Sequence, residues 1–295
     1  MTEAHIEREI QSQPECWRRA ADVAPRHASV LPQAGERVAV VGCGTSWFIA
    51  QAYARLREDG GHGETDAFAA SEMPEGRSYD RILAITRSGT TTEVLDLLKQ
   101  VRGTTPTVAI TAVPESPIAD VADTIVSLDF ADEESVVQTR FATTALMLLR
   151  ASLGDDVDTA LSDLSTALTS DLHPQLLTAE QITFLGQGWS VGLANEAALK
   201  MREAAQAWTE SYPAMDYRHG PISVTTTGRV VWILGAAPDG LVADVERTGG
   251  HAETSSLDPL AELVRVQRLA LATARAKGLD PDQPRNLTRS VILDH

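Results

Sequence analysis

Cysteine is scarce in this sequence, which has only Cys16 and Cys43 among its 295 residues. The two lie far apart, and neither belongs to a CxxC motif or to a Cys/His cluster. The spacing therefore gives no support to a disulfide framework or a zinc site, and both thiols are predicted to be reduced. We expect no metal ion and no cofactor.

Positive charge is also in short supply, with 25 Lys and Arg against 41 Asp and Glu and a net charge of -16. Such a chain is not expected to present a broad basic surface to nucleic acid or to an anionic membrane. Any anionic ligand must instead be held locally by a few specific groups. We expect neither a nucleic-acid partner nor a membrane partner.

Long apolar segments are missing too. No window approaches the roughly 20 apolar residues that a membrane-spanning helix needs. The N-terminal residues MTEAHIEREIQSQP lack the basic and apolar regions of an export signal, so the protein is predicted to be cytoplasmic. Apolar residues still make up 43% of the chain, which is enough for a substantial core.

Two common nucleotide-binding motifs are incomplete or absent. Residues 42–46 read Gly-Cys-Gly-Thr-Ser, but a dinucleotide fingerprint requires a third glycine where Trp47 stands. The phosphate-loop pattern GxxxxGK[ST] does not occur anywhere. The sequence thus argues against NAD and excludes a Walker-type nucleotide site.

Alternating strand-like and helix-like segments make up the first half of the chain. Residues 1–30 are predicted to form a helical arm, with Ile6, Ile10 and Trp17 on one face. Strand patterns at 37–41, 81–86, 107–111 and 124–130 then alternate with helical patterns at 47–59, 93–101 and 135–154. This alternation indicates a parallel sheet, so the fold class is α/β, with a first domain over residues 31–152.

The second half repeats the beginning of the first. Residues 153–178 have helical spacing and are predicted to be a linker. A strand at 181–185, a GxGxS turn and a helix at 191–208 then recur at an offset of 144 residues from the first half. A further strand at 229–237 and a helix at 239–250 continue the match. We therefore predict an internal duplication, with a second domain over residues 179–295.

Hydroxyl-rich turns follow two strands of the first half. A turn that opens a helix offers free N–H groups and the positive end of the helix dipole to an anion. Residues 86–91, Thr-Arg-Ser-Gly-Thr-Thr, combine four hydroxyls, a glycine and a cation, which suits a phosphomonoester. The same residues are typical of a helix N-cap without a ligand, and the motif alone does not decide. The second half has no such turn, so only the first is expected to hold a phosphate.

Three charged residues share one face of the helix predicted in the second half. Glu196, Lys200 and Glu203 stand at positions i, i+4 and i+7. A carboxylate beside a carbonyl can move a proton between neighbouring carbons. The alternative for this spacing is a solvent-facing ion pair. The Ala- and Leu-rich composition of the helix favours burial instead.

Seven sequence blocks, taken in order, carry a resemblance to a known family. They are REIQSQP (8–14), VGCGTS (41–46), SGTTTE (88–93), SVVQTRFATTALML (135–148), LGQGWSVGLANEAALKMRE (185–203), RHGP (218–221) and QPRNLTRSV (283–291). On these blocks the chain resembles the SIS (sugar isomerase) domain family, and specifically the isomerase half of glutamine:fructose-6-phosphate amidotransferase. The resemblance implies two tandem SIS domains, each a doubly wound parallel sheet flanked by helices, and a homodimer.

The resemblance also implies a sugar-phosphate site. Its expected substrate-binding residues are Thr45, Ser46, Thr86, Ser88, Thr91, Val136 and Gln138. Arg87 replaces the glutamine usual in the family, and its added guanidinium is expected to strengthen phosphate binding or to change which sugar fits.

Catalytic roles follow from the same resemblance. Glu203 is the expected base, and Lys200 and Glu196 set its ionisation and position. His219, supplied from the adjacent subunit, would open the sugar ring, a task that suits a group titrating near neutrality. A lone histidine before Gly-Pro is otherwise typical of an ordinary loop.

Two departures from the family limit the chemistry. Arg289 stands where relatives have a lysine that forms a Schiff base, and arginine stays protonated, so its expected role is to bind the sugar or its phosphate. The chain begins Met1-Thr2, without a cysteine-led glutaminase domain, so glutamine hydrolysis is not expected. We predict an isomerase, deaminase or deglycase acting on an amino or ordinary hexose 6-phosphate. The alternative is a noncatalytic regulatory protein that senses a sugar phosphate.

Overall fold

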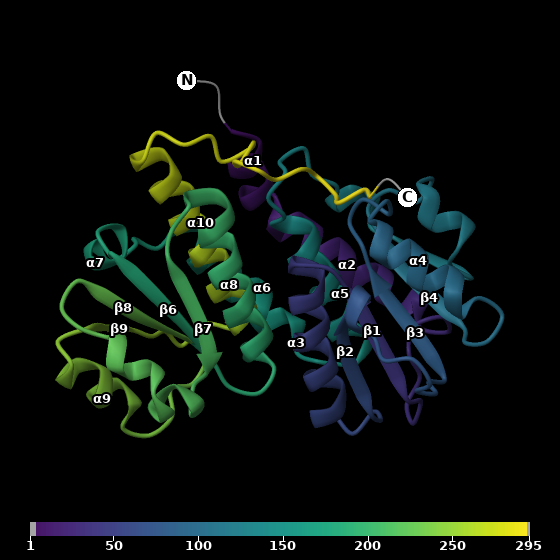
Figure 1. Ribbon diagram of the computed structural model, residues 1–295, viewed down its shortest axis with the longest axis horizontal. Helices are drawn as coiled ribbons and strands as arrows, with labels where there is room; N and C mark the ends of the chain where they lie inside the picture. The colour runs from purple at the N-terminus through teal and green to yellow at the C-terminus, as the bar shows by residue number, and fades with distance from the viewer. Residues whose placement is uncertain (1–3, 294–295) are drawn as a thin grey trace. The chain divides into compact units, whose positions relative to one another are not determined.

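The computed structural model describes residues 4–293, which form two parallel β-sheets flanked by helices (Figure 1). The strand order is β2-β1-β3-β4-β5 in one sheet and β7-β6-β8-β9 in the other. Every neighbouring pair is parallel. Parallel strands need crossover connections, which helices provide here, so the predicted α/β class is confirmed.

The first sheet consists of β1 (Val38–Gly42), β2 (Thr65–Ala69), β3 (Arg81–Ile85), β4 (Thr107–Thr111) and β5 (Thr124–Ser127). The second consists of β6 (Gln181–Gly186), β7 (Thr209–Pro213), β8 (Arg229–Leu234) and β9 (His251–Glu253). The α-helices are α1 (His5–Gln11), α2 (Gln13–His27), α3 (Thr45–Asp59), α4 (Thr92–Val101), α5 (Arg140–Ser152), α6 (Val157–Thr169), α7 (Pro174–Leu177), α8 (Ser190–Ala205), α9 (Leu241–Arg247) and α10 (Pro259–Ala276).

The chain divides into two compact units, and each unit is made of three separate segments of the sequence. One unit joins the chain up to Gln11, residues 135–139 and residues 158–287, and contains the four-stranded sheet. The other joins residues 12–134, residues 140–157 and the chain from Thr288 onward, and contains the five-stranded sheet. The predicted N-terminal arm is helical, but α1 and α2 belong to different units. The domain limits predicted from the sequence stay predictions.

Helices pack on each sheet within its own unit. In the five-stranded unit α3 lies against β1 and β2, and α5 packs against α2 and α3. The Trp17 indole of α2 is fully buried there and donates a hydrogen bond to the Thr143 hydroxyl of α5, 3.0 Å away. In the four-stranded unit α8 lies against β6 and β7 and packs against α10. Burial of these apolar faces stabilises each unit.

The six strands predicted from the sequence are present, whereas three short strands and one helix are not among the predicted elements. The unpredicted strands β2, β7 and β9 lie at sheet edges, and their sequences TDAFA, TESYP and HAE mix polar with apolar residues. Helix α10 is buried at every position from 260 to 267. Its charged residues Glu262 and Arg265 are buried as an ion pair 2.8 Å apart, so they do not mark a solvent-facing stripe, and periodicity alone does not reveal the helix.

The helix predicted over residues 135–154 begins later than expected, at Arg140. The buried carboxylate of Glu9 accepts the Ser135 N–H at 3.1 Å and also bonds the Ser135 hydroxyl. The same hydroxyl donates to the carbonyl of Val137 at 2.8 Å. These bonds satisfy the Ser135 N–H and the Val137 carbonyl outside a helix, so the helical sequence pattern begins before the helix itself.

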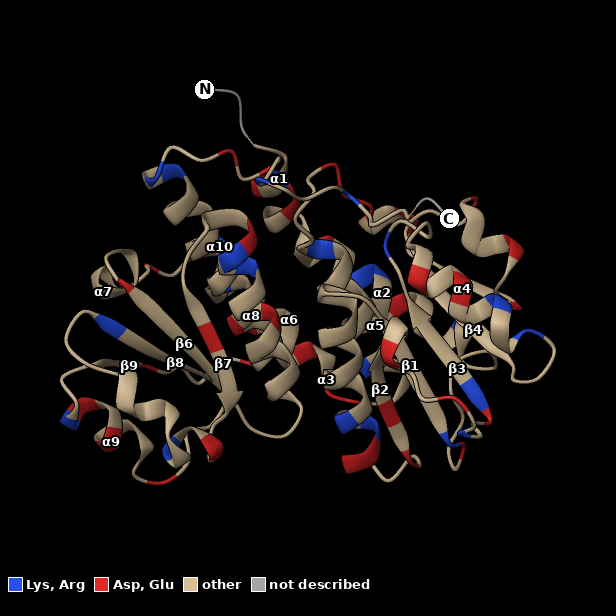
Figure 2. Cartoon of the chain, viewed as in Figure 1, with Lys and Arg blue, Asp and Glu red and all other residues tan. Residues whose placement is uncertain are grey.

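Charge is distributed in small groups over both units. Figure 2 shows acidic and basic segments interspersed along helices and strands in this view. That pattern agrees with an acidic chain of net charge -16 whose positive residues are mostly paired with neighbouring carboxylates. None of the helices within residues 4–293 is long and apolar enough to cross a membrane.

Both cysteines are free, as the sequence predicts. Cys16 is buried on α2, and Cys43 lies in the turn after β1. Burial, reinforced by the nearby Glu93 carboxylate, raises the pKa of the Cys43 thiol to about 11. The thiol is therefore protonated at neutral pH, which argues against a nucleophilic role.

A glycine ends the first strand of each sheet. A Cβ on Gly42 would stand 2.7 Å from the backbone of Ser46, and one on Gly186 would stand 2.3 Å from the carbonyl oxygen of Ser190. Contacts this short exclude a side chain, so each glycine lets the following helix lie directly against the strand. The two positions are 144 residues apart, the offset of the predicted duplication.

We expect Gly186→Ala to lower the free energy of unfolding by about 1–3 kcal/mol, because backbone atoms must move to admit the new methyl group. Denaturant unfolding would measure the change. Gly60→Ala is the control, because a Cβ there would be nearest the rotatable side chain of His62. Equal stability of the Gly186 variant and the parent would contradict the close approach.

Candidate functional site

Both sheets reverse their direction of winding next to their first strand. From β1 the chain passes to β2 on one side and then to β3 on the other, so the loops after β1 and β3 diverge. Open parallel sheets bind ligands outside the carboxyl ends of the strands at such a switch point. The two hydroxyl-rich turns follow these two strands. Strands β6 and β8 have the same relation in the other sheet.

The turn after β1 holds two of the predicted residues. Gly44 has a φ of 53°, in the left-handed region, which lets the chain turn sharply from β1 into α3. Thr45 and Ser46 are the first residues of α3, and both are buried. The Ser46 hydroxyl forms no hydrogen bond within residues 4–293 and so stays available to a ligand.

The turn after β3 holds Thr86, Ser88 and Thr91, which also lie at the carboxyl ends of the strands. Gly89 has a φ of 63°, and a Cβ there would meet the Ser116 hydroxyl at 1.9 Å, so only glycine fits. The Ser88 hydroxyl oxygen accepts the Thr90 N–H at 3.3 Å and lies 2.9 Å from the Thr90 hydroxyl. These contacts hold the turn in a tight loop.

The side-chain capping expected of such a sequence does not occur at this turn. Thr91 precedes α4, but its side chain makes no capping bond, and neither it nor Thr86 forms a side-chain hydrogen bond in the described chain. The Thr92 N–H at the start of α4 donates instead to the Val291 carbonyl, 3.2 Å away. The hydroxyls of this turn are therefore not needed to cap the helix.

Arg87 of the same turn lies in a buried ion pair. Its guanidinium is 3.3 Å from the Glu133 carboxylate, and the two side chains are 1% and 0% exposed. The other oxygen of Glu133 accepts the Arg140 N–H at 2.7 Å. Further hydrogen bonds make a buried pair tolerable, and both carboxylate oxygens of Glu133 are bonded here. The charge of Arg87 is therefore already matched, and its predicted contact with substrate stays a prediction.

The C-terminal segment lies across this turn. Arg87 donates to the Arg289 carbonyl at 3.0 Å, and the hydroxyls of Thr90 and Ser290 are 2.8 Å apart. The Arg289 guanidinium bonds the Asp132 carboxylate and the Glu133 carbonyl. Arg289 thus anchors the segment, whereas its predicted binding of the sugar or phosphate stays untested.

Sequence reasoning does not identify Glu133 or Ser290 as part of this region. An acidic loop is visible at residues 132–134, but nothing in it indicates which carboxylate pairs with Arg87. Ser290 contacts a residue 200 positions earlier in the chain, and no local pattern signals a contact over that separation.

The corresponding serine of the four-stranded sheet has a different environment. Ser190, 144 residues after Ser46, accepts the Gln187 N–H at 2.9 Å and donates to the Leu234 carbonyl at 2.8 Å. Its hydroxyl therefore links the turn after β6 to the end of β8. This agrees with the expectation that the second half is not equipped to hold a phosphate.

The three charged residues of α8 lie together as their spacing predicts. Lys200 Nζ is 2.5 Å from Glu203 Oε2 and 3.4 Å from Glu196 Oε1. Lys200 and Glu196 are 1% exposed, whereas the Glu203 side chain is 20% exposed. The solvent-facing alternative is therefore wrong for Glu196 and Lys200. The arrangement leaves Glu203 as the carboxylate that a ligand can reach.

His219 and Glu203 lie at opposite ends of the strands of the four-stranded sheet. Helix α8 starts at the carboxyl end of β6, so Glu203 lies about 20 Å further along it, toward the amino ends of the strands. His219 ends a short 3-10 helix (Asp216–His219) that follows the carboxyl end of β7, and it is exposed. Arg218 fixes this turn through Asp244, 2.7 Å away. Within one chain the two predicted catalytic residues are therefore far apart.

Val136 and Gln138, the remaining predicted residues, lie in the segment before α5. The Val136 N–H donates to the Asp282 carbonyl at 3.1 Å. The Gln138 side-chain oxygen is buried and has no hydrogen-bond partner among residues 4–293. Both belong to the unit with the four-stranded sheet, together with Glu196, Lys200, Glu203 and His219. The hydroxyl turns, Arg87 and Arg289 belong to the other unit.

Part of the chain matches the model of a known protein family. The model of the SIS domain family matches residues 31–153, which include β1 to β5 and both hydroxyl turns. Glutamine–fructose-6-phosphate aminotransferase (isomerizing) of Sulfurisphaera tokodaii is 29% identical over 298 residues, covering 88% of this chain and 50% of the relative. The chain spans about half the length of the curated relatives it matches.

Solved structures share the fold over nearly the whole chain. The C-terminal domain of glucosamine-fructose-6-phosphate aminotransferase from Francisella tularensis has a TM-score of 0.84 at 20% identity, covering 96% of this chain and 98% of that one. Glucosamine-6-phosphate deaminase from Thermotoga maritima has a TM-score of 0.79 at 24% identity, covering 98% and 100%. Residues 31–153 are therefore a SIS domain, and the chain is homologous to the isomerase domain of glutamine–fructose-6-phosphate aminotransferase.

Proposed function

We propose that this chain binds a sugar phosphate and moves protons along the sugar, as a phosphosugar aldose-ketose isomerase or an aminosugar-phosphate deaminase or deglycase. The SIS domain and relatives named as an isomerizing aminotransferase and a deaminase support this class of reaction. We also propose that the four-stranded sheet is a second, tandem SIS domain. The equivalent glycines at 42 and 186 support that assignment.

The observation that carries the proposal is the set of hydroxyls at the β1/β3 switch point. Ser46, Thr86 and Thr91 come from the two turns that follow these strands, and their hydroxyls lack partners in the described chain. Hydroxyls without protein partners remain available to donate and accept hydrogen bonds, and hydroxyls of this kind suit the oxygens of a phosphomonoester. In the proposed complex they donate hydrogen bonds to the phosphate, with Ser88 and Thr45 beside them.

Glu203 is the proposed proton-transfer group. Its carboxylate takes the proton from a carbon next to the sugar carbonyl while the C–H electron pair forms the double bond of an enediol. The carbonyl oxygen takes a proton from solvent to complete the enediol. Returning the carbon-bound proton to the neighbouring carbon, with loss of the other hydroxyl proton to solvent, yields the isomer. With an amino group in place of that hydroxyl the product is an imine, which water hydrolyses to the keto sugar with release of ammonia. Lys200, 2.5 Å away, holds the Glu203 carboxylate in position, and Glu196, 3.4 Å from Lys200, holds the ammonium group in turn.

His219 is proposed to act on the ring oxygen of a substrate held by another subunit of a homodimer. Its location supports this role, because within its own unit it lies at the opposite sheet edge from Glu203. An exposed imidazole next to the Arg218–Asp244 ion pair suits a group that must reach a neighbouring chain. Arg289 cannot form a Schiff base, so acid and base catalysis carry the proposed reaction.

We expect Ser46→Ala to raise the KM for a hexose 6-phosphate by roughly tenfold or more, because a hydrogen bond to a charged phosphate is lost. Steady-state kinetics would measure the change. Ser190→Ala is the matched control at the equivalent position, where the hydroxyl bonds only the backbone. That variant should lose stability and keep its KM. Equal KM changes in the two variants would show that the first turn does not bind the phosphate.

Arg87→Gln should lower the free energy of unfolding by about 3–5 kcal/mol, because it leaves the Glu133 carboxylate buried without its partner. Denaturant unfolding would measure the loss. Arg87→Gln combined with Glu133→Gln should recover most of it, since no unpaired charge remains. If the recovered double variant still binds substrate at least tenfold more weakly, Arg87 contacts the substrate as the sequence predicts.

Glu203→Gln should lower turnover by roughly 10² to 10⁴ while substrate affinity changes little, because an amide cannot accept the proton. Incubation with amino and ordinary hexose 6-phosphates in deuterated water should introduce deuterium at C1 or C2 with the parent and not with the variant. Glu246→Gln, an exposed carboxylate on α9, is the control. Absence of exchange by the parent, combined with thermal stabilisation by a sugar phosphate, would indicate a binding protein without this activity.

A further inference from the structure

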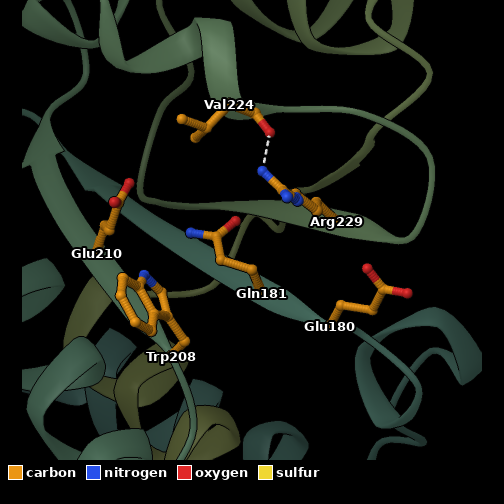
Figure 3. A pocket seen from close by; sticks show the side chains of 6 residues that line it. All are labelled: Glu180, Gln181, Trp208, Glu210, Val224 and Arg229. Atoms are coloured by element: carbon orange, nitrogen blue, oxygen red, sulfur yellow. Dashed lines mark hydrogen bonds between the residues drawn. The ribbon is translucent and has the colours of Figure 1, made fainter.

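A cavity of about 380 Å³ lies at the amino ends of the strands in the four-stranded sheet (Figure 3). It is lined by Glu180, Gln181, Trp208, Glu210, Val224 and Arg229. Gln181 and Arg229 begin β6 and β8, and Trp208 and Glu210 stand at the start of β7. None of these residues belongs to the hydroxyl turns or to the Glu196–Lys200–Glu203 group.

The cavity combines an exposed aromatic ring with a buried, unpaired polar group. Trp208 is 76% exposed, which is unusual for so large an apolar side chain. Gln181 is only 8% exposed, and its side-chain nitrogen donates to the Thr183 hydroxyl at 2.8 Å. Its side-chain oxygen is buried and has no partner within residues 4–293. In Figure 3 this amide stands between Trp208 and Glu210 on one side and Arg229 on the other.

The charges around the cavity favour a cation. Two carboxylates, Glu180 and Glu210, face one guanidinium, and Arg229 already donates to the Val224 carbonyl. Glu210 Oε2 is buried and, like the Gln181 oxygen, accepts no hydrogen bond from the described residues. Arg229 Nε is likewise buried without a partner among the described residues, so the lining offers two unpaired acceptor oxygens and one unpaired donor. A ligand that matches it brings N–H or O–H groups together with an acceptor such as a hydroxyl oxygen. The excess negative charge disfavours a phosphate.

We propose that this cavity is a second binding site, for a small hydroxylated amine such as an unphosphorylated aminohexose. The indole provides a flat face for the ring and attracts the ammonium group, which Glu210 and the Gln181 oxygen then hydrogen-bond. The cavity volume lies within the range of small-molecule sites. This site is independent of the proposed phosphosugar chemistry and selects against the phosphorylated form.

Tryptophan fluorescence tests the proposal, because Trp208 is highly exposed whereas Trp17 and Trp232 are fully buried. Trp47 and Trp189 are partly buried, so a change that is absent from Trp208→Ala is the signal assigned to this cavity. Titration with glucosamine should give a saturable change, whereas glucose and glucosamine 6-phosphate should bind at least about tenfold more weakly. Ser88→Ala, a variant of the hydroxyl turn, should leave glucosamine binding unchanged. The proposal of this second site and the proposal of the phosphosugar site are then tested independently.

Two variants locate the binding. Glu210→Gln should weaken glucosamine binding by about tenfold, and calorimetry with Trp208→Ala should detect little or none. Glu246→Gln, which removes an exposed carboxylate of the same unit, is the matched control. The proposal is overturned if glucose binds as well as glucosamine, if Glu210→Gln behaves like the control, or if glucosamine does not bind the parent. Resistance of Trp208 to a soluble quencher would also overturn it, because the ring would then be covered.

Discussion

The close approach of a helix to the strand before it is the constraint on which both units depend. At Gly42 and at Gly186 the chain leaves no room for a Cβ, so α3 and α8 begin directly against the ends of β1 and β6. Each helix N-terminus then stands at the carboxyl edge of its sheet, where open parallel sheets bind ligands. The same geometry places the C-terminal end of α8 toward the amino ends of the strands. A single backbone requirement therefore determines where the hydroxyls and the acidic helix residues lie.

The two turns share this geometry and differ in their chemistry. Ser46 has a hydroxyl without a partner in the described chain, whereas Ser190 bonds the backbone on both sides of its own turn. A hydroxyl that already donates and accepts has little to offer a ligand. The turn after β8 also has no hydroxyl residues to match Thr86, Ser88 and Thr91. The two sheets are thus suited to separate tasks, one to anion binding and the other to carrying charged side chains.

Charge in this acidic protein acts locally. Arg87 is matched by Glu133, and Lys200 lies between Glu196 and Glu203, so both of these buried cations have a carboxylate within 3.4 Å. Such pairing makes the burial of charge tolerable, and it leaves Glu203 as the partly exposed member of its group. At the other end of β6, the carboxylates near Trp208 exceed the single Arg229. The net charge of the chain therefore says little about what each site binds.

Much of the fold and part of the site could be predicted from the sequence. The central strands and most helices follow from apolar periodicity, and the shared face of Glu196, Lys200 and Glu203 follows from helical spacing. The edge strands β2, β7 and β9 could not be predicted in this way, because their pairing depends on a neighbouring strand more than on their own pattern. The start of α5 likewise depends on Glu9, 126 residues before Ser135.

The sequence by itself determined the α/β class, the repeated glycine turns and the hydroxyl-rich segment, because each is a property of neighbouring residues. Only the tertiary structure decided which of those hydroxyls stay unpaired and which charges are already matched. Arg87 meets Glu133 across 46 residues, Ser190 meets Leu234 across 44, and Thr90 meets Ser290 across 200. Contacts over such separations form only when the sheets assemble, so the residues near each position in the sequence do not predict them.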